Sequence, residues 1–578
     1  MLLLINGTTI AFNLTLKFFE GKENIDSYML LDDELEFIED YAFILLRKCD
    51  YLRITSRKLT TIGERTLYGL FSMDTLELVG NSNLIEIRNR SFSSLESLKK
   101  LSLEANRLKN LNERTFEGLT ILEELSLRSN QLTSSNLATQ SFSALANLLL
   151  LDLFDNQLTE INQFQFQKNK NLTRLNLANN KISSISGLEG LQSLKFLDLN
   201  DNQLPNVTVN MFRNLPSLIT LSLSRCKINS IEDNSFESLK NLYSLILDYN
   251  SMPLLTENAL AGLTNLNDLN MNTAGIRTLN GKCFQHLSKL FFLDLDNNMI
   301  EKLGDSTFVG LDNLRLFKLN GNQISEISAL AFEPLRMLES IELNENRLKQ
   351  FDALLSPTLS SFYMNEQKIN QTLQIGDFFF DLFESGNNWT NESVARRIFA
   401  TIVNENQLSV LKLSKRSFCM RDMTRKEYVT FRLDYFSFVN INTCQFKQLV
   451  KKNSSTTEFE FNIYFSNQTA QYYANLNCEM VGFLEDLGMN FKMSGVVPQI
   501  NDVWSYCRTT LNRTRKMQSL DELCHFNATE YEEFNCERTI ITTTTPPQTT
   551  TTTNRNLIID IVTIIRNIWT TSISWVFP

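Results

Sequence analysis

A pattern of leucines and asparagines recurs along the first two thirds of the chain, usually at intervals of 24 residues. From Leu98 it reads LKKLSLEANRLKNL, which is L-x-x-L-x-L-x-x-N-x-L-x-x-L. The asparagine position falls at Asn106, Asn130, Asn156, Asn180, Asn202, Cys226, Asn250, Ala274, Asn298, Asn322 and Asn346, with fainter copies at Asp33, Arg57, Asn81 and Gln367. A fixed period of this kind predicts about 14 to 15 stacked turns of one solenoid.

The leucines of each L-x-L segment predict a short strand, because alternate side chains of a strand point to the same face. One such strand cannot bury its inner face alone, so we expect the copies to stack into a parallel sheet on the inner curve. The asparagine ends each strand, and its amide can bond to backbone groups of adjacent turns. An aromatic residue follows most ladder positions, and we expect these rings to form a spine under the outer curve: Phe43, Phe92, Phe116, Phe142, Phe166, Phe212, Phe236, Phe284, Phe308 and Phe332.

Cys226 occupies one asparagine position. It could be a reactive thiol, a metal ligand, half of a disulfide or a substitute for asparagine. A bridge to Cys283 would span two repeats, which is beyond the reach of a disulfide. A thiol fits a small buried site and makes a weak hydrogen bond, so we interpret Cys226 as a structural substitute.

The repeat resembles the 24-residue leucine-rich repeat of extracellular proteins, as in Toll-like receptor ectodomains, Slit proteins and small leucine-rich proteoglycans. The L-x-x-L-x-L blocks and the Phe-x-x-Leu tails, such as Phe308 to Leu311, carry the resemblance over residues 25–370. It implies an α/β repeat solenoid, a horseshoe whose parallel concave sheet binds proteins or other large ligands. The cysteine-rich caps usual in this family are absent, since Cys49 alone lies near the first copies and no close cysteine pair follows Ile369.

The composition argues against several functions. The formal net charge is −10 and no long basic run occurs, which disfavours nucleic acid as a partner. The chain has 2 histidines, the residue on which most metal sites and acid–base sites depend. We therefore expect no cofactor, no metal and no enzymatic activity.

The outward positions of the strands predict a binding surface. The middle outward column includes Asp152, Asp198 and Asp294, and aromatic residues stand at three outward positions that should be solvated, Phe154, Phe196 and Phe292. Exposed aromatics among charges are typical of interface hot spots, although single exposed apolar residues are ordinary. The predicted ligand-binding residues are Leu150, Asp152, Phe154, Arg174, Phe196, Asp198, Phe292, Asp294 and Asp296.

The period fades near Gln371, and residues 371–540 are predicted to form a small α+β domain that resembles no family we recognise. Tyr428 to Phe438 and Thr457 to Asn467 alternate like strands, and Val503 to Cys524 has a helical pattern. Six cysteines in this segment favour disulfides and an oxidising compartment: Cys419, Cys444, Cys478, Cys507, Cys524 and Cys536. Candidate N-glycosylation sites are Asn171, Asn206, Asn370, Asn388, Asn391, Asn453, Asn467, Asn512 and Asn527.

The two ends of the chain lead to different predictions. Residues 1–24 read as an N-terminal cap or the remainder of a secretion signal. Residues 541–555 are a Thr/Pro-rich stalk, a composition that cannot bury a core. In residues 556–578, Asp560 and Arg566 interrupt the apolar run, so we expect an amphipathic helix that contacts a membrane peripherally or packs on a partner; the alternative is a disordered tail.

These observations favour an extracellular, secreted or cell-surface recognition protein that binds a protein ligand on the concave face of the solenoid. Two alternatives stay open. The chain could be a matrix component of the proteoglycan type, or residues 371–540 could carry an enzymatic activity. The ligand, the disulfide pairing and the oligomeric state do not follow from the sequence.

Overall fold

The computed structural model describes residues 2–6, 13–21, 24–279 and 281–351. Beyond these it describes 353, 355, 358–359, 361–364, 367 and six strands that lie between residues 373 and 464. The chain divides into two units, Met1–Glu530 and Tyr531–Pro578, and every described residue belongs to the first. The predicted stalk and tail therefore lie outside the described residues.

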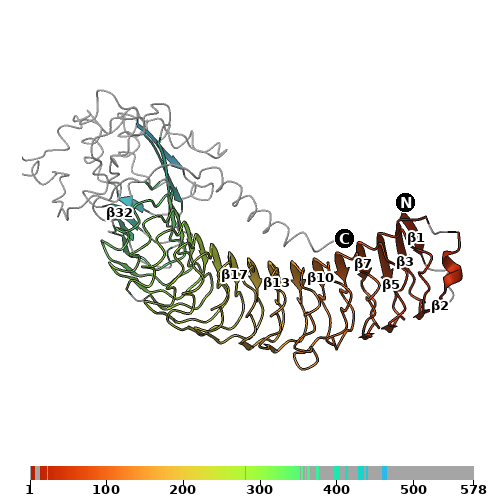
Figure 1. Cartoon of the computed structure of the whole chain (residues 1–578). Coiled ribbons are helices and arrows are strands. Elements are labelled where there is room, and N and C mark those ends of the chain that lie inside the picture. The colour runs from red at the N-terminus through yellow and green to blue at the C-terminus, as the bar shows by residue number, and fades with distance from the viewer. Residues whose placement is uncertain are drawn as a thin grey trace, which may run out of the picture. The chain divides into compact units, whose positions relative to one another are not determined.

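One large parallel sheet of 19 strands organises the described part of the chain. Its strands follow one another in chain order and, in Figure 1, lie along the inner side of the curved solenoid. They are β1 (Leu2–Asn6), β3 (Ser27–Leu31), β5 (Tyr51–Thr55), β7 (Thr75–Leu78), β9 (Lys100–Ser102), β10 (Glu124–Ser126), β11 (Leu150–Asp152), β13 (Arg174–Asn176), β15 (Phe196–Asp198), β17 (Thr220–Ser222), β19 (Ser244–Ile246), β21 (Asp268–Asn270), β23 (Phe292–Asp294), β25 (Leu316–Lys318), β27 (Ser340–Glu342), β29 (Ser361–Tyr363), β31 (Arg396–Val403), β33 (Glu427–Asp434) and β35 (Phe459–Tyr464).

Shorter strands pair in parallel on the other side of the turns. They are β2 (Asn13–Leu14) with β4 (Phe37–Ile38), β6 (Thr61–Ile62) with β8 (Glu86–Ile87), β12 (Glu160–Ile161) with β14 (Ser184–Ile185), β16 (Asn206–Val207) with β18 (Ser230–Ile231), β20 (Leu254–Leu255) with β22 (Thr278–Leu279), β24 (Lys302–Leu303) with β26 (Glu326–Ile327), and the row β28 (Gln350–Phe351), β30 (Leu373–Ile375), β32 (Val410–Leu413) and β34 (Phe438–Asn440). The predicted parallel-sheet solenoid is confirmed.

The asparagines form the predicted ladder, and Asn156 shows its geometry. Its Nδ2 donates to the carbonyls of Leu127 and Leu153 at 3.0 and 3.1 Å, and its Oδ1 accepts the Leu132 N–H at 3.1 Å. The residue before it, Asp155, has a φ of 57°, and the same left-handed conformation precedes the ladder residue in most turns. This conformation turns the chain so that the amide points inward.

Cys226 takes the place of asparagine as predicted. It is fully buried, and its Sγ donates to the Leu199 carbonyl at 3.0 Å, as the amides do in other turns. Burial raises the pKa of its thiol to about 12, which keeps it protonated. Cys49, Cys226 and Cys283 are all free and buried.

The ladder residues of the first two turns differ from the prediction. Asp32 and Ser56 are buried there, whereas Asp33 and Arg57 are solvent-exposed and form an ion pair with each other. The backbone of Ser56 donates to Asn81, so Ser56 is the residue in line with the ladder. Neither turn has a residue with left-handed φ before the ladder position. The polar residue one position earlier in the sequence than predicted therefore occupies it.

The phenylalanine spine is confirmed. Phe92, Phe116, Phe142 and Phe166 are fully buried and stack with ring centroids 5.9 to 6.2 Å apart. No aromatic residue continues the spine between Phe166 and Phe212, where the asparagine step shortens to 22 residues. Gly187 lies in this short turn, and a Cβ there would come within 1.9 Å of the Asn162 carbonyl oxygen.

Aromatic side chains close the N-terminal end of the core. A short 3-10 helix, η1 (Leu16–Phe19), places Phe19 against Tyr28 and Phe43, with ring centroids 5.5 and 5.3 Å apart. Phe19 is fully buried. Phe19 thus continues the row of buried aromatic side chains one turn before Phe43.

The described strands beyond residue 371 extend the sheets of the solenoid. β31, β33 and β35 add to the large sheet, and β30, β32 and β34 add to the outer row, all in parallel. The two strands predicted near Tyr428 and Thr457 are present as β33 and β35. The predicted separate, disulfide-bonded α+β domain finds no support in these strands, and its six cysteines and its helix at 503–524 lie outside the described residues.

Candidate functional site

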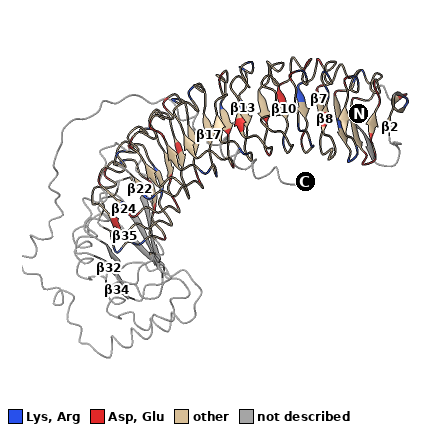
Figure 2. Cartoon of the chain, turned by 90° about the horizontal axis from the view of Figure 1, so that it is seen from below, with Lys and Arg blue, Asp and Glu red and all other residues tan. Residues whose placement is uncertain are grey.

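Three outward columns of side chains cross the large sheet. In the middle column Asp152 pairs in register with Asn176, and Asn176 with Asp198. The same column continues through Asp294, Lys318 and Glu342, so the alignment inferred from the sequence is confirmed. In Figure 2, stretches of ribbon coloured red for Asp and Glu appear on several strands between β10 and β24.

The carboxylates of the middle column have a structural role that the sequence reading did not foresee. Asp152 Oδ1 accepts the Phe154 N–H at 2.9 Å, Asp198 Oδ1 accepts the Asn200 N–H at 3.0 Å, and Asp294 Oδ1 accepts the Asp296 N–H at 2.9 Å. Asn176 and Asn270 make the same bond two residues ahead. These are Asx turns that end the strands, so one oxygen of each carboxylate is already used.

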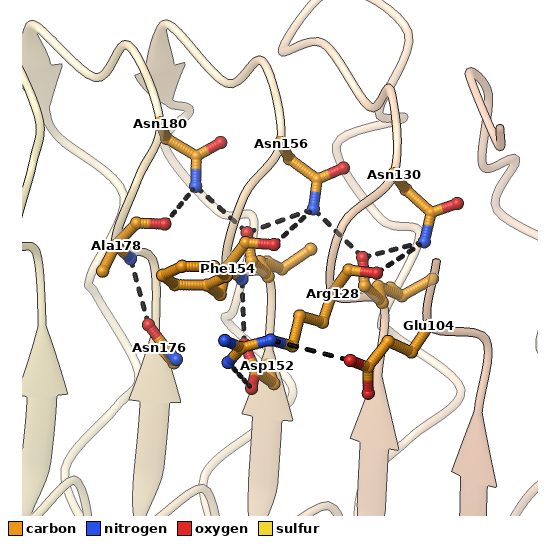
Figure 3. A network of polar contacts seen from close by, with 11 residues as sticks. Glu104, Arg128, Asn130, Asp152, Phe154, Asn156, Asn176, Ala178 and Asn180 are labelled. Atoms are coloured by element: carbon orange, nitrogen blue, oxygen red, sulfur yellow. Dashed lines mark hydrogen bonds and ion pairs between the residues drawn. The ribbon is translucent and has the colours of Figure 1, made fainter. Parts of the chain in front are cut away.

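The Phe154 side chain lies under a cation from the preceding strand. The Arg128 guanidinium carbon is 3.9 Å from the ring centroid, a cation–π geometry. Arg128 also lies 3.7 Å from Glu104 Oε1 and 3.7 Å from Asp152 Oδ2 (Figure 3). Phe154 is therefore a partly buried ring held in a charged network.

The Phe196 ring has a similar partner. The Arg174 guanidinium carbon is 4.8 Å from its centroid, and the two residues are in register on β13 and β15. Leu150 precedes Arg174 in the same column. We name Leu150, Asp152, Phe154, Arg174, Phe196 and Asp198 the Phe154 cluster, since β11, β13 and β15 bring them side by side.

Phe292 lies apart from this cluster, on β23. The Lys318 ammonium is 5.7 Å from its ring centroid. Asp296 accepts the Asn320 N–H at 2.6 Å, and the Asn320 amide donates to Glu342 at 2.6 Å. The structure thus divides the predicted site residues into two groups, with β17, β19 and β21 between them.

The prediction that the three phenylalanines are solvated was wrong. Phe154, Phe196 and Phe292 are all partly buried, because a cationic side chain of an adjacent strand covers each ring. Two aromatic residues just outside the strands are more exposed, Phe291 at 36% and Tyr249 at 48%, with Arg315 and Arg225 over their rings.

Burial raises the pKa of several carboxyl groups on the sheet face. It raises the pKa of Asp198 and of Asp296 to about 6, against the hydrogen bonds that each accepts. It also raises the pKa of Asp268 to about 6 and the pKa values of Asp152 and Asp294. The face therefore carries partly desolvated negative charge, which favours a positively charged partner.

The remaining predicted residues are placed as follows. Asn171 and Asn206 are exposed, as glycosylation sites must be, and the other seven candidates lie outside the described residues. Among the residues that the structure describes, no group of three or more His, Cys, Asp or Glu side chains is arranged to hold a metal ion. In the same part of the chain, no helix has the length and apolar character needed to cross a bilayer.

Sequence reasoning placed Asp268 on this face without selecting it as a site residue, and it missed Glu104 and Arg128. Asp268 lies on β21, whereas Glu104 and Arg128 lie two residues beyond the ends of β9 and β10. The strand register could not show how far a long side chain extends sideways, and this length lets Arg128 contact both neighbouring turns.

The repeats match a known family. Six overlapping matches to the leucine rich repeat model cover residues 78–132, 96–158, 146–204, 197–252, 240–300 and 293–348. Residues 78–348 are a leucine-rich repeat domain. A comparison with curated proteins finds no match.

Several solved structures are similar to this chain. A chain of the Toll–Spatzle complex of Drosophila superposes with a TM-score of 0.62 at 19% identity, covering 79% of this chain and 60% of that one. Its glycosylated form gives a TM-score of 0.54 at 19% identity, with 79% and 61% covered. The Leptospira interrogans leucine-rich repeat protein LIC12759 is 26% identical, with 61% of this chain and 84% of that chain covered and a TM-score of 0.48. This chain spans less than two thirds of the Toll-complex chain.

Proposed function

We propose that this leucine-rich repeat chain is a non-enzymatic recognition protein of the extracellular space or cell surface. It binds a protein ligand on the outward face of the large sheet, and the Phe154 cluster anchors that ligand. The observation that carries the proposal is the pair of arginine-covered rings, Arg128 on Phe154 and Arg174 on Phe196.

Aromatic and arginine side chains are the residues most enriched in interface hot spots. Here the sheet fixes them before any ligand arrives, so little conformational entropy remains to be lost on binding. The partly desolvated carboxylates of Asp152 and Asp198 complement a ligand that carries a basic patch. Fold similarity to a chain of the Toll–Spatzle complex supports an extracellular receptor setting.

The test is a binding screen of the full chain, made in a secretory host, against an array of secreted and cell-surface proteins. For the partner found, the double variant Phe154→Ser and Phe196→Ser should bind about 100-fold more weakly, since two hot spots are lost. The matched control is Val209→Ser with Leu330→Ser, which removes two exposed apolar side chains from the outer turns.

Melting temperatures of both double variants show whether the fold survives. The proposal fails if the Phe154 and Phe196 variant keeps its fold and its affinity. It also fails if the outer-turn control loses affinity to the same degree.

A further inference from the structure

Asp268 differs from the other aspartates of the sheet face. It stands at the first outward position of β21, whereas Asp152, Asp198 and Asp294 stand in the middle column and cap their strands. Among the described residues, no donor lies within hydrogen-bonding distance of its carboxylate, and no cation pairs with it. Burial alone raises its pKa, which fits a carboxylate set among apolar groups.

In its column Asp268 lies between Ser244 on β19 and Phe292 on β23. Asp268 pairs in register with Phe292, and Phe292 with Leu316. The Asp268 N–H bonds to the carbonyl of Tyr243 at 3.0 Å, which places Tyr243 at the adjacent strand, and burial together with the charge of Asp268 raises the pKa of the Tyr243 hydroxyl. We name Tyr243, Asp268, Phe291, Phe292 and Leu316 the Asp268 patch.

Two members of the patch are exposed, Phe291 at 36% and Leu316 at 38%. Two cations lie over rings of the patch, Arg315 at 5.7 Å from the Phe291 centroid and Lys318 at 5.7 Å from the Phe292 centroid. Arg315 also forms an ion pair with Glu339 at 2.6 Å. Within the described part of the chain, Asp268 is thus a carboxylate that no cation pairs with, beside aromatic rings that Arg315 and Lys318 partly cover.

A flat apolar partner would not suit such a surface. Covering Asp268 with apolar groups would remove water from a carboxylate without replacing its hydrogen bonds, which is strongly unfavourable. A partner that brings a cation to Asp268 and apolar groups to the rings offsets that cost. Apolar groups around the ion pair also exclude water and strengthen it.

We propose that the Asp268 patch is a second docking point, which takes a Lys or Arg side chain flanked by apolar side chains of a protein partner. The proposal rests on the proposed function in one respect, that the sheet face receives a protein. It names a different part of that face, five strands along from β11 and outside the Phe154 cluster.

The test is a selection of random peptides of about 12 residues, displayed on phage, against the full chain. Wild type and the control Asp312→Asn, which removes an exposed carboxylate from a turn, should enrich peptides with Lys or Arg next to Leu, Ile or Phe. The enriched peptide, made synthetically, should bind Asp268→Asn about tenfold more weakly or worse. Asparagine keeps the size of the side chain, and an unchanged melting temperature verifies the fold.

Several outcomes overturn the inference: no cationic peptide is enriched, or Asp268→Asn enriches and binds the same peptides as wild type. The Phe154→Ser and Phe196→Ser variant separates the two proposals. A peptide that this variant loses and Asp268→Asn keeps supports the Phe154 cluster and refutes the Asp268 patch. The reverse pattern supports the patch and refutes the cluster.

Discussion

At the scale of single residues, the ladder shows how one amide joins two neighbouring turns. Asn298 donates to Met271 and Leu295 at 2.9 and 3.0 Å and accepts from Ile276 at 2.9 Å. These partners are backbone groups that the short strands leave without a bond. A buried group that loses its partner costs more than the bond itself contributes, so the slot tolerates few residue types.

Replacing a ladder asparagine should lower the free energy of unfolding more than replacing Cys226 does. Asn156→Ala leaves the Leu132 N–H without a partner and removes one of the two amide donors of the Leu127 and Leu153 carbonyls, and we expect a loss of about 2–3 kcal/mol in the free energy of unfolding. Cys226→Ala removes a weaker donor, and we expect a loss of about 1 kcal/mol. Urea denaturation of both variants measures this, and equal losses would contradict the account.

The buried carboxyls predict a specific pH dependence of stability. The pKa of Asp198 is raised to about 6 in the folded protein, above its unfolded value, so the folded state binds the extra proton. This group therefore lowers stability as the pH rises from about 4 to above 6. Asp198→Asn keeps the acceptor for the Asn200 N–H and removes the charge.

We expect Asp198→Asn to be more stable than wild type by about 1–2 kcal/mol at about pH 7.5. The difference should disappear near pH 4, where the wild-type carboxyl is protonated. Chemical denaturation at both pH values provides the comparison. A variant less stable than wild type at the higher pH would show that the Asp198 charge stabilises the strand end.

At the scale of elements, many turns pair a leucine strand with an aromatic that stacks on the next turn. Phe142 lies between Phe116 and Phe166, with centroid distances of 6.2 and 5.9 Å, and is fully buried. The energy of the solenoid is then close to a sum over neighbouring turns.

Phe142→Ala should lower the free energy of unfolding by about 3–5 kcal/mol, because it opens a cavity between two stacked rings. Phe71→Ala offers a control on an aromatic side chain that is 42% exposed, and we expect a change within about 1 kcal/mol. Thermal and urea denaturation of the pair test the spine. A small effect at Phe142 would mean that the outer layer adds little to stability.

Element boundaries also show what the sequence could predict. The spacing of Leu101 and Leu103 determines which side chains of β9 point inward, so the columns of the sheet face followed from the pattern alone. The leucine pattern did not predict that Asp32 and Ser56 occupy the ladder positions of their turns, because this depends on whether a residue with left-handed φ precedes the position. The pattern also did not predict that arginine side chains cover the rings of Phe154 and Phe196, because it carries no information on where a long side chain lies.

At the scale of the whole molecule, the described strands beyond residue 371 add to both sheets although the leucine pattern has faded there. A parallel edge can accept a further strand through backbone bonds alone, so the pairing does not require the repeat sequence. The sheet face is the surface that all these turns share, and the central claim is that a protein ligand occupies it.

A glycan placed on that face tests the claim most directly. Asn272→Thr creates an Asn-x-Thr sequon at Asn270 on the outward face of β21, and Arg114→Thr creates one at Asn112 on an exposed outer turn. Both variants would be made in a secretory host, and mass spectrometry would verify that each added site carries a glycan. We predict that the β21 glycan abolishes binding of the partner found in the screen and that the outer-turn glycan leaves it unchanged. Full binding with the β21 site occupied, or loss with the outer-turn site occupied, would contradict the account.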